Sequence, residues 1–254
     1  MNSLTQSAQR TSRRDFLKKA GLVGATMAIG GIAEPLLAPV QAFAATTPES
    51  LQEIFNLALT AEQLATTFYY TGIQVGPKAL PQSANPGNLP YLQAALDAEN
   101  VHATIMQQAG GVSLAGANPV FYFPTGTFSS DLNFLGVLNA LETAFIEAYL
   151  AAVYQFGLNG RSDLAQLAGE ILGVESEHRV LGKQIVTDFT NLLVPNNLYL
   201  EQADGTSVAV VAQALVPFLS ANQFGGQSTP GYSLPTQSQI TAAVGPNAGT
   251  NPNT

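Results

Sequence analysis

The sequence of 254 residues contains no cysteine, no tryptophan and only two histidines. Without cysteine the chain cannot form a disulfide framework, a thiolate-bound zinc or iron–sulfur site, or a cysteine nucleophile. Any metal ion that its side chains bind must therefore use histidine and carboxylate ligands.

Basic residues are also scarce: nine Lys and Arg stand against 17 Asp and Glu, which gives a formal net charge of −8. Nucleic acids and anionic membrane surfaces bind clusters of Lys and Arg, so neither is expected as a partner. The acidic balance favours cations instead. With 46% hydrophobic residues, the chain is long enough to bury the core of one domain that carries appendages.

Residues 1–44 have the organisation of an export signal. The basic motif Ser-Arg-Arg-Asp-Phe-Leu-Lys at 12–18 precedes an apolar run at 20–33, and Ala-Phe-Ala at 42–44 places small residues at the spacing of a cleavage site. The apolar run has about 14 residues, whereas a transmembrane helix needs about 20. The segment resembles a twin-arginine signal peptide, so we expect cleavage and no transmembrane anchor in the mature chain.

This resemblance implies a partner and a location. The chain is expected to be recognised by the twin-arginine export machinery and to reach the periplasm, the cell surface or the extracellular space. Proteins on this route fold before export, so a cofactor can be inserted in the cytoplasm. Cleavage after Ala44 removes five of the nine basic and two of the 17 acidic residues, which leaves four positive and 15 negative side chains, a net charge of −11.

Four segments show the spacing of three and four residues between apolar side chains that indicates amphipathic helices. They run over about 48–70, 89–109, 131–156 and 162–189. Asp131 is a candidate N-cap of the third segment, and Ser162 or Asp163 is a candidate N-cap of the fourth. Each apolar stripe is interrupted near its middle by a glutamate.

The connections between these helices indicate the topology. Residues 72–90 form a loop rich in Pro, Gly and Asn, and the short turn at 157–161 forces the last two helices to be antiparallel. The long link at 110–130 contains an aromatic stretch at 120–123, which is expected to pack against the bundle. Two hairpins joined by one long crossover make a ferritin-like four-helix bundle, an all-α fold that is expected over 45–195.

Two further segments follow the bundle. Residues 206–219 carry apolar side chains on one face, which predicts a short fifth helix within 196–222, with its end disturbed by Pro217. Residues 223–254 are rich in Gly, Pro, Ser, Thr, Asn and Gln and are expected to form an irregular tail rather than a domain.

Both histidines follow a glutamate by three residues, in Glu99-x-x-His102 and Glu175-x-x-His178. Residues three apart on a helix point about 60° apart, so both side chains reach the same ion, as in di-iron and di-manganese carboxylate proteins. With eleven Glu among 254 residues, both histidines would have this spacing by chance with a probability of about 0.2%. The pattern therefore indicates metal binding.

The other two helices each place one glutamate, Glu62 or Glu142, on the apolar stripe, whereas Glu147 and Glu177 are expected to face outward. Four carboxylates buried in a bundle need a large positive charge, which two divalent ions supply, Fe as the first expectation and Mn as the second. The expected ligands are Glu62, Glu99, His102, Glu142, Glu175 and His178. In this site Glu62 and Glu142 are expected to bind one ion each, and the two glutamates of the Glu-x-x-His motifs to bridge both ions.

Four neighbouring residues complete the expectations for the site. Tyr69 and Tyr149 each lie seven residues after a predicted ligand on the same stripe, so they are either partners of the ligands or ordinary core tyrosines. Arg179 and Lys183 fall off the stripe and are expected to face solvent. A buried polar network without metal is the alternative for the whole cluster, but it leaves negative charge uncompensated.

Several stretches resemble the exported ferritin-like family that includes desiccation-related proteins of bacteria and plants. They lie at 59–69, 99–102, 141–150 and 171–178, and the similarity spans about 48–220. The resemblance implies the bundle and a di-metal site, but the superfamily includes storage ferritins, rubrerythrins, manganese catalases and di-iron oxidases, so the reaction stays open.

Some relatives fit less well. Rubrerythrins carry an iron domain with four cysteines, and DNA-protecting miniferritins use basic arms, neither of which this chain has. The long first loop and the tail depart from the compact bundle of storage ferritins. Soluble di-iron oxygenases need an electron-donating partner, on which the sequence is silent.

Two classes of function follow from these observations. The first is an exported di-metal redox protein that reacts with O2 or peroxide and limits oxidative damage under stress, of ferroxidase, peroxidase or catalase type. The second is a structural or desiccation-protective protein whose metal site only holds the bundle together or stays vacant. Either is compatible with a homo-oligomer.

Overall fold

The computed structural model describes residues 47–75, 87–191, 195, 198–203, 205–221, 223–224 and 230–249. The predicted signal peptide at 1–44 lies outside these residues, as does most of the predicted loop at 72–90.

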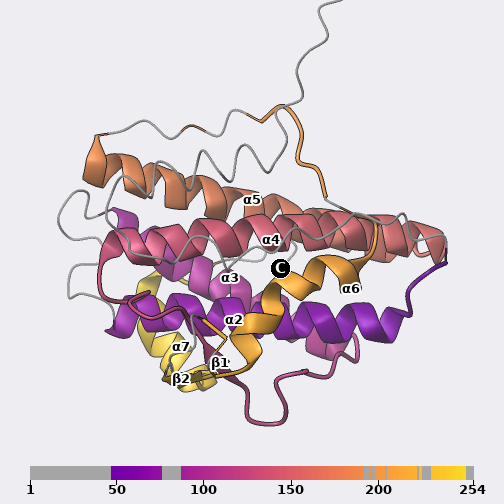
Figure 1. Ribbon diagram of the computed structural model, residues 1–254, viewed down its shortest axis with the longest axis horizontal. Helices are drawn as coiled ribbons and strands as arrows, with labels where there is room; N and C mark the ends of the chain where they lie inside the picture. Colours follow the sequence, from indigo (N-terminus) through magenta and orange to yellow (C-terminus); the bar gives the residue numbers. More distant parts are fainter. Residues whose placement is uncertain are drawn as a thin grey trace, which may run out of the picture.

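Four long helices form the body of the molecule (Figure 1). They are α2 (Leu51–Val75), α3 (Asn88–Gln108), α4 (Asp131–Leu158) and α5 (Ser162–Thr190). α2 packs along α3 and α4 packs along α5, so the helices form two hairpins. This confirms the predicted all-α bundle. By length and composition alone α4 could cross a membrane, but most of its apolar stretch is buried within the bundle.

The helix starts differ slightly from the expected ones. Ser130, not Asp131, is the N-cap of α4: its backbone is extended and its hydroxyl accepts a hydrogen bond from Asn133 N at 3.2 Å. The N-cap of α5 is Arg161, which forms a bidentate ion pair with Asp163, so neither predicted residue caps this helix.

The crossover between the hairpins packs against the bundle as predicted. β1 (Val120–Tyr122) pairs antiparallel with β2 (Gly231–Ser233), which belongs to the C-terminal segment. Phe121 lies opposite Tyr232 in this pairing and, like Phe123, is fully buried. The aromatic side chains therefore attach both the crossover and the C-terminal segment to the core.

The segments after the bundle are more regular than expected. The predicted fifth helix is a short α-helix, α6 (Val208–Val211), which continues as the 3-10 helix η1 (Ala212–Leu219) and contains Pro217. The expectation of an irregular tail is wrong for 231–247, which hold β2, α7 (Gln237–Val244) and the 3-10 turn η2 (Gly245–Asn247). α7 forms because Thr236 and Gln239 make a capping box and because its apolar face is buried on the bundle.

The buried apolar residues form two clusters. One includes Phe68 and Phe134, whose rings stack with centroids 4.5 Å apart, and the other includes Phe55 and Phe156. On α3 and α5 the two clusters lie on opposite sides of the Glu-x-x-His motif, whereas on α4 the first cluster continues past Glu142 to Phe145. The apolar ends therefore hold a polar layer in the middle of the bundle.

Candidate metal centre

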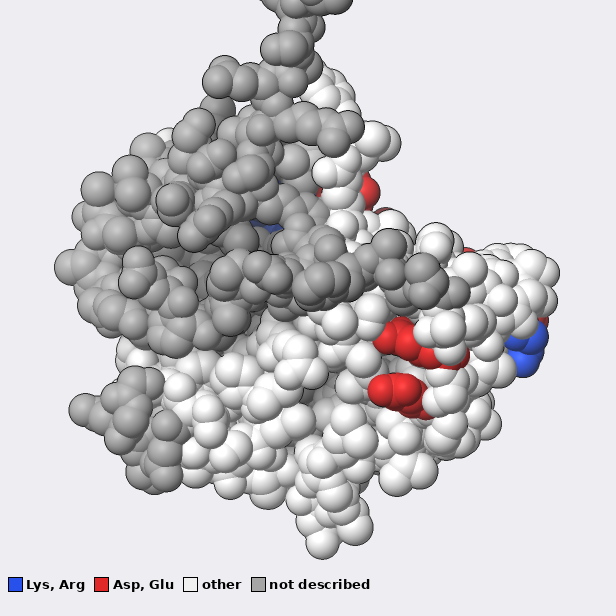
Figure 2. All heavy atoms as spheres, turned by 45° about the vertical axis from the view of Figure 1, so that its right-hand side comes forward, with Lys and Arg blue, Asp and Glu red and all other residues white. Residues whose placement is uncertain are grey.

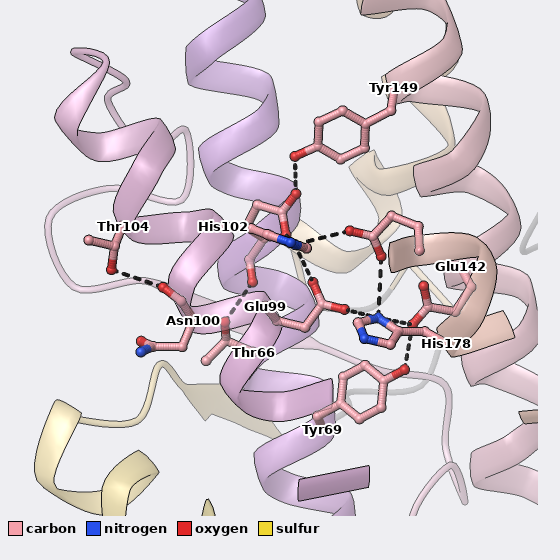
Figure 3. Close-up of polar contacts among 11 residues, drawn as sticks. Thr66, Tyr69, Glu99, Asn100, His102, Thr104, Glu142, Tyr149 and His178 are labelled. Carbon is pink, nitrogen blue, oxygen red and sulfur yellow. Dashed lines mark hydrogen bonds and ion pairs between the residues drawn. The ribbon is translucent and has the colours of Figure 1, made fainter. Parts of the chain in front are cut away.

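All six predicted ligands lie in this polar layer, on four different helices. Figure 3 labels four of them, Glu99, His102, Glu142 and His178. α2 provides Glu62, α4 provides Glu142, and α3 and α5 each provide a Glu-x-x-His pair. Every one of the six is buried, with exposed fractions from 0% to 7%. By contrast, Glu177 is exposed, and Glu147 is half-buried outside the cluster. The structure thus brings together the predicted residues.

The donor atoms form two overlapping groups, each with its atoms within 4.8 Å of one another. One group consists of Glu62, Glu99, His102 and Glu175, and the other of Glu99, Glu142, Glu175 and His178. Glu99 and Glu175 belong to both groups. The arrangement is compatible with two ions that share two carboxylates.

Each histidine turns Nδ1 towards the carboxylates. His102 Nδ1 lies 3.2 Å from Glu175 Oε1 and 3.5 Å from Glu62 Oε2. His178 Nδ1 lies 2.8 Å from Glu99 Oε1 and 3.5 Å from Glu175 Oε2. Nδ1 is therefore the ring atom that each histidine would offer to a metal.

The chemistry of these atoms fits metal ions. Although buried polar groups in proteins are nearly always satisfied, eight buried donor atoms of the cluster make no well-aligned hydrogen bond. They are Glu62 Oε2, both carboxylate oxygens of Glu99 and of Glu175, Glu142 Oε2, and Nδ1 of His102 and of His178. Lone pairs that converge without a cation are costly to bury, and divalent ions would remove that cost.

Two tyrosines hold the outer carboxylates in a crossed arrangement. Tyr69 on α2 donates its hydroxyl hydrogen to Glu142 Oε1 on α4 at 2.5 Å. Tyr149 on α4 donates to Glu62 Oε1 on α2. Each tyrosine therefore positions a carboxylate of the other hairpin. The alternative of ordinary core tyrosines is wrong for their hydroxyl groups, because both hydroxyls bond directly to predicted ligands.

The cluster retains protons when it holds no metal. Burial first, and then the charge of Glu175, raise the pKa of Glu62 and of Glu142 well above the ordinary value. Burial lowers the pKa of His102 and His178, but contacts with the carboxylates outweigh it, so both pKa values rise. These four groups favour their protonated forms, and a metal would have to displace the protons.

Glu99 and the tyrosines behave differently from these four groups. Burial raises the pKa of Glu99, but the two histidines outweigh this effect and lower its pKa below the usual range. The pKa values of Tyr69 and Tyr149 are raised, first by burial and then by the nearby carboxylates. The phenol hydrogens therefore stay in place as hydrogen-bond donors.

The expectation that Arg179 and Lys183 face solvent is wrong. Both residues are buried, and Glu201, from the segment after the bundle, contacts Arg179. Arg179 forms a bidentate ion pair with Glu201, and Nη1 lies 3.2 Å from Oε2. Burial lowers the pKa of Lys183, and the charge of Arg179 lowers it further. Helical periodicity indicates contacts within the bundle only, so it could not predict the contact between Arg179 and Glu201.

Residues 50–187 match the family model of the ferritin-like domain, which is more than half of the chain. The chain belongs to the ferritin-like domain family. The matched region includes all six residues of the cluster and parts of all four long helices. No curated protein and no solved structure matches the chain.

Membership of the ferritin-like domain family agrees with the topology of two packed hairpins and with a buried Glu/His cluster in their centre. Domains of this family bind metal ions, and these Glu and His side chains are able to do so here. The match extends neither to the C-terminal segment nor to residues 1–44.

Proposed function

We propose that this ferritin-like protein binds two divalent metal ions, Fe first and Mn second, and uses them in redox chemistry with O2 or peroxide. The observation that supports this best is the pair of overlapping donor groups, in which eight buried atoms converge without a well-aligned hydrogen bond. A merely structural polar network would have its groups satisfied by one another.

The residues have distinct roles in this proposal. Glu62 and Glu142 each bind one ion, Glu99 and Glu175 reach both, and one histidine completes each set. A pair of Fe or Mn ions can change between the +2 and +3 states and thereby exchange electrons with oxygen or peroxide. The carboxylates favour the more highly charged state, because their negative charge offsets the added positive charge.

Tyr69 and Tyr149 orient the outer carboxylates and keep one oxygen of each occupied by a hydrogen bond. This restricts how Glu62 and Glu142 can bind and leaves Oε2 of each for an ion. The apolar clusters on both sides exclude bulk water from the layer. O2 and hydrogen peroxide are small and uncharged, which suits a site of this depth.

A location outside the cytoplasm is part of the proposal. It rests on the twin-arginine resemblance of residues 1–44 and on the acidic balance of the remaining chain. Figure 2 shows acidic side chains on one face of the molecule and few Lys or Arg among the atoms that are described there. An acidic surface attracts metal cations. Peroxide disproportionation needs no external electrons, which suits a cysteine-free exported protein in stress protection.

Turnover by the metal-loaded protein tests the redox function. We expect holoprotein to consume Fe(II) with O2, or hydrogen peroxide alone, faster than Glu62→Ala protein does. Glu177→Ala, which removes an exposed carboxylate from the same bundle, is the matched control and should react like the wild type. Equal rates for the wild type and Glu62→Ala would exclude the redox function. Elemental analysis of protein from its native compartment identifies the metal, because affinity alone favours the wrong ions during overexpression.

One observation favours the second candidate, a metal that only stabilises the fold. Glu99 and Glu175 have no exposed surface at all, so the ions would be enclosed. Under this alternative, metal removal lowers the melting temperature while holoprotein shows no turnover. The two measurements together therefore separate the candidates.

Export has its own test. Replacing Arg13 and Arg14 with Lys keeps the charge but removes the pair that the twin-arginine receptor reads. We expect full-length protein to accumulate in the cytoplasm, which cell fractionation followed by immunoblotting detects. A conservative control is Lys19→Arg, which lies after the motif and leaves the arginine pair intact. Normal export of the Arg13/Arg14 variant would show that the chain uses another route.

A further inference from the structure

A cavity of about 180 Å3 lies on the outer side of the α2–α3 hairpin, beneath the C-terminal segment. None of the six residues of the metal centre lines it. Figure 3 shows Asn100 and Thr104, two of its lining residues, on the side of α3 that points away from Glu99 and the other carboxylates. The cavity is therefore a separate feature of the molecule.

The polar part of the cavity wall consists of neutral groups. Four carboxamides line it, from Gln63, Asn100, Gln107 and Gln237, and hydroxyl groups come from two threonines. Among the described residues, none of these carboxamides makes a hydrogen bond to another protein group. Each carboxamide offers two donors and two acceptors. Gln63 and Asn100 are half-buried, and Gln107 and Gln237 are exposed, so neutral groups without a protein partner surround a space that is partly open to solvent.

The rest of the wall is aliphatic, and among the described residues no charged or aromatic side chain lines the cavity. An ionic ligand would lose hydration without gaining a countercharge, and an aromatic ligand would leave the carboxamides without partners. A cavity of about 150 Å3 is known to hold a ligand the size of benzene. The space here therefore suits a neutral molecule of about six to twelve non-hydrogen atoms that carries both C–H and O–H groups.

The C-terminal segment forms the outer wall of the cavity through residues 234–240. Three hydrogen bonds attach this segment to α3. Gln93 Nε2 donates to Ala243 O at 2.6 Å, Asn247 Nδ2 donates to Gln93 Oε1 at 2.8 Å, and Gly249 N donates to Asp97 Oδ2 at 2.8 Å. Because the wall is fixed, the cavity exists before a ligand arrives, which lowers the entropic cost of binding.

We propose that this cavity binds a small neutral polyhydroxy compound, a polyol of three to six carbons. Its hydroxyl groups pair with the four carboxamides, and its C–H groups contact the aliphatic side chains. The C-terminal segment then has a function of its own: it completes a binding site that the four-helix bundle alone does not contain. The site does not depend on metal in the cluster.

Calorimetric titration of the mature, metal-loaded protein with glycerol and with sorbitol tests this proposal. We expect saturable binding, because a defined set of groups is occupied, rather than the general stabilisation that polyols exert by exclusion from protein surfaces. Asn100→Ala together with Gln107→Ala should weaken binding about tenfold, because the loss of each neutral hydrogen bond lowers the affinity several-fold. Ala103→Leu should abolish binding by filling the space.

The matched control is Gln166→Ala, which removes an exposed carboxamide on α5 that bonds to Glu170. It should bind both polyols like the wild type. Circular dichroism melting checks that each variant is folded. The Asn100/Gln107 variant changes only side chains that make no hydrogen bond to another described residue. It therefore still tests the proposal if Ala103→Leu does not fold. Absence of saturable binding, equal affinity in the Asn100/Gln107 variant, or tighter binding of benzene than of either polyol would each overturn the proposal.

Discussion

The hydroxyl groups of Tyr69 and Tyr149 link the two hairpins by hydrogen bonds between α2 and α4. Each hydroxyl bonds to the outer carboxylate of the opposite hairpin, so the position of Glu62 depends on α4 and that of Glu142 depends on α2. The donor set is thus fixed by cross-bundle contacts as well as by the register of each helix.

Tyr69→Phe and Tyr149→Phe isolate this effect, because each change removes only the hydroxyl oxygen. We expect metal affinity to fall about tenfold or more in each variant, as is typical when a group that orients a ligand is lost. Competitive metal titration with a chelator of known affinity measures the change. Tyr154→Phe, at a partly exposed position on α4, is the control. Unchanged affinity in both cluster variants would show that the two bonds do not position the ligands.

The histidines provide the second prediction at this scale. We expect His102→Ala and His178→Ala each to lower metal occupancy and the melting temperature, because each removes one Nδ1 donor from one of the two groups. Glu147→Ala and Glu177→Ala should change occupancy little, since neither residue belongs to the cluster. Elemental analysis and thermal denaturation of the four variants provide the comparison. Equal losses in all four would contradict the assignment of the ligands.

Helical register made the cluster predictable from sequence. The two Glu-x-x-His motifs, and the one glutamate on each remaining apolar stripe, specify which side chains face the bundle axis. Arg179 lies next to His178 in the sequence, yet its burial could not be predicted in this way. It depends on Glu201, which is 22 residues away on a segment without periodicity, so no local pattern in α5 carries the information.

At the scale of helices and strands, α4 and α5 approach each other closely at Gly182. A Cβ atom on this residue would lie 2.6 Å from Leu138 Cδ2 and 3.0 Å from Asn139 Oδ1. Leu138 is fully buried, so it has little room to move. The absence of a side chain at Gly182 therefore lets the two helices of the second hairpin pack together.

Gly182→Ala should consequently destabilise the protein by about 1–3 kcal/mol, the usual cost of overpacking a core, despite the better helix propensity of alanine. Gly173 lies on the same helix, is exposed, and has no atom within 4 Å of a would-be Cβ. Gly173→Ala should therefore stabilise the protein by up to about 1 kcal/mol. Chemical denaturation of both variants measures these opposite effects. Stabilisation by both changes would show that the helices separate to accept a methyl group.

The elements outside the bundle show where sequence patterns fail. Four long amphipathic stripes predicted α2 to α5 because each helix buries one face along its whole length. The sequence did not predict β2 and α7, because their segment is rich in Gly, Pro and Gln. They form only because distant partners are present. β2 needs β1, and Ile240 of α7 needs the bundle as a surface to bury against. Such structure depends on tertiary contacts rather than on local propensity.

At the scale of the whole molecule, the apolar clusters on either side of the polar layer should keep the metal-free protein helical. The polar layer is the part of the fold whose stability depends most on proton uptake. In the metal-free form its protons partly replace the missing positive charge. Metal and protons therefore compete for the same lone pairs, and pH links this competition to unfolding.

The direction of the pH effect follows from the shifted pKa values. Glu62, Glu142, His102 and His178 all have pKa values raised by folding, so the folded metal-free protein holds more protons than the unfolded chain does. Its stability must then fall as pH rises above the ordinary values, 4.5 for Glu and 6.5 for His. Glu99, whose pKa is lowered, acts in the opposite direction, but its contribution is complete once the pH is above about 5.

We therefore expect the melting temperature of the metal-free protein to fall between about pH 5.5 and pH 8, because each titrating group contributes a slope of up to about 1.4 kcal/mol per pH unit. The metal-loaded protein should not show this fall, since bound ions hold the same groups deprotonated. Its advantage over the metal-free form should thus grow with pH and shrink in acid. Differential scanning calorimetry of both forms, with metal loss verified by elemental analysis, measures the difference.

A double variant, Glu62→Gln with Glu142→Gln, separates this cause from a general effect of pH. Glutamine resembles the protonated carboxyl group but cannot titrate, so the metal-free variant should lose part of the pH dependence of its melting temperature. Glu177→Gln changes an exposed carboxylate and should leave the dependence intact. A melting temperature that is constant or rises with pH in the metal-free wild type would contradict the proton-holding cluster. If chelation also left the melting temperature unchanged at neutral pH, the six residues would form a structural network rather than a metal site.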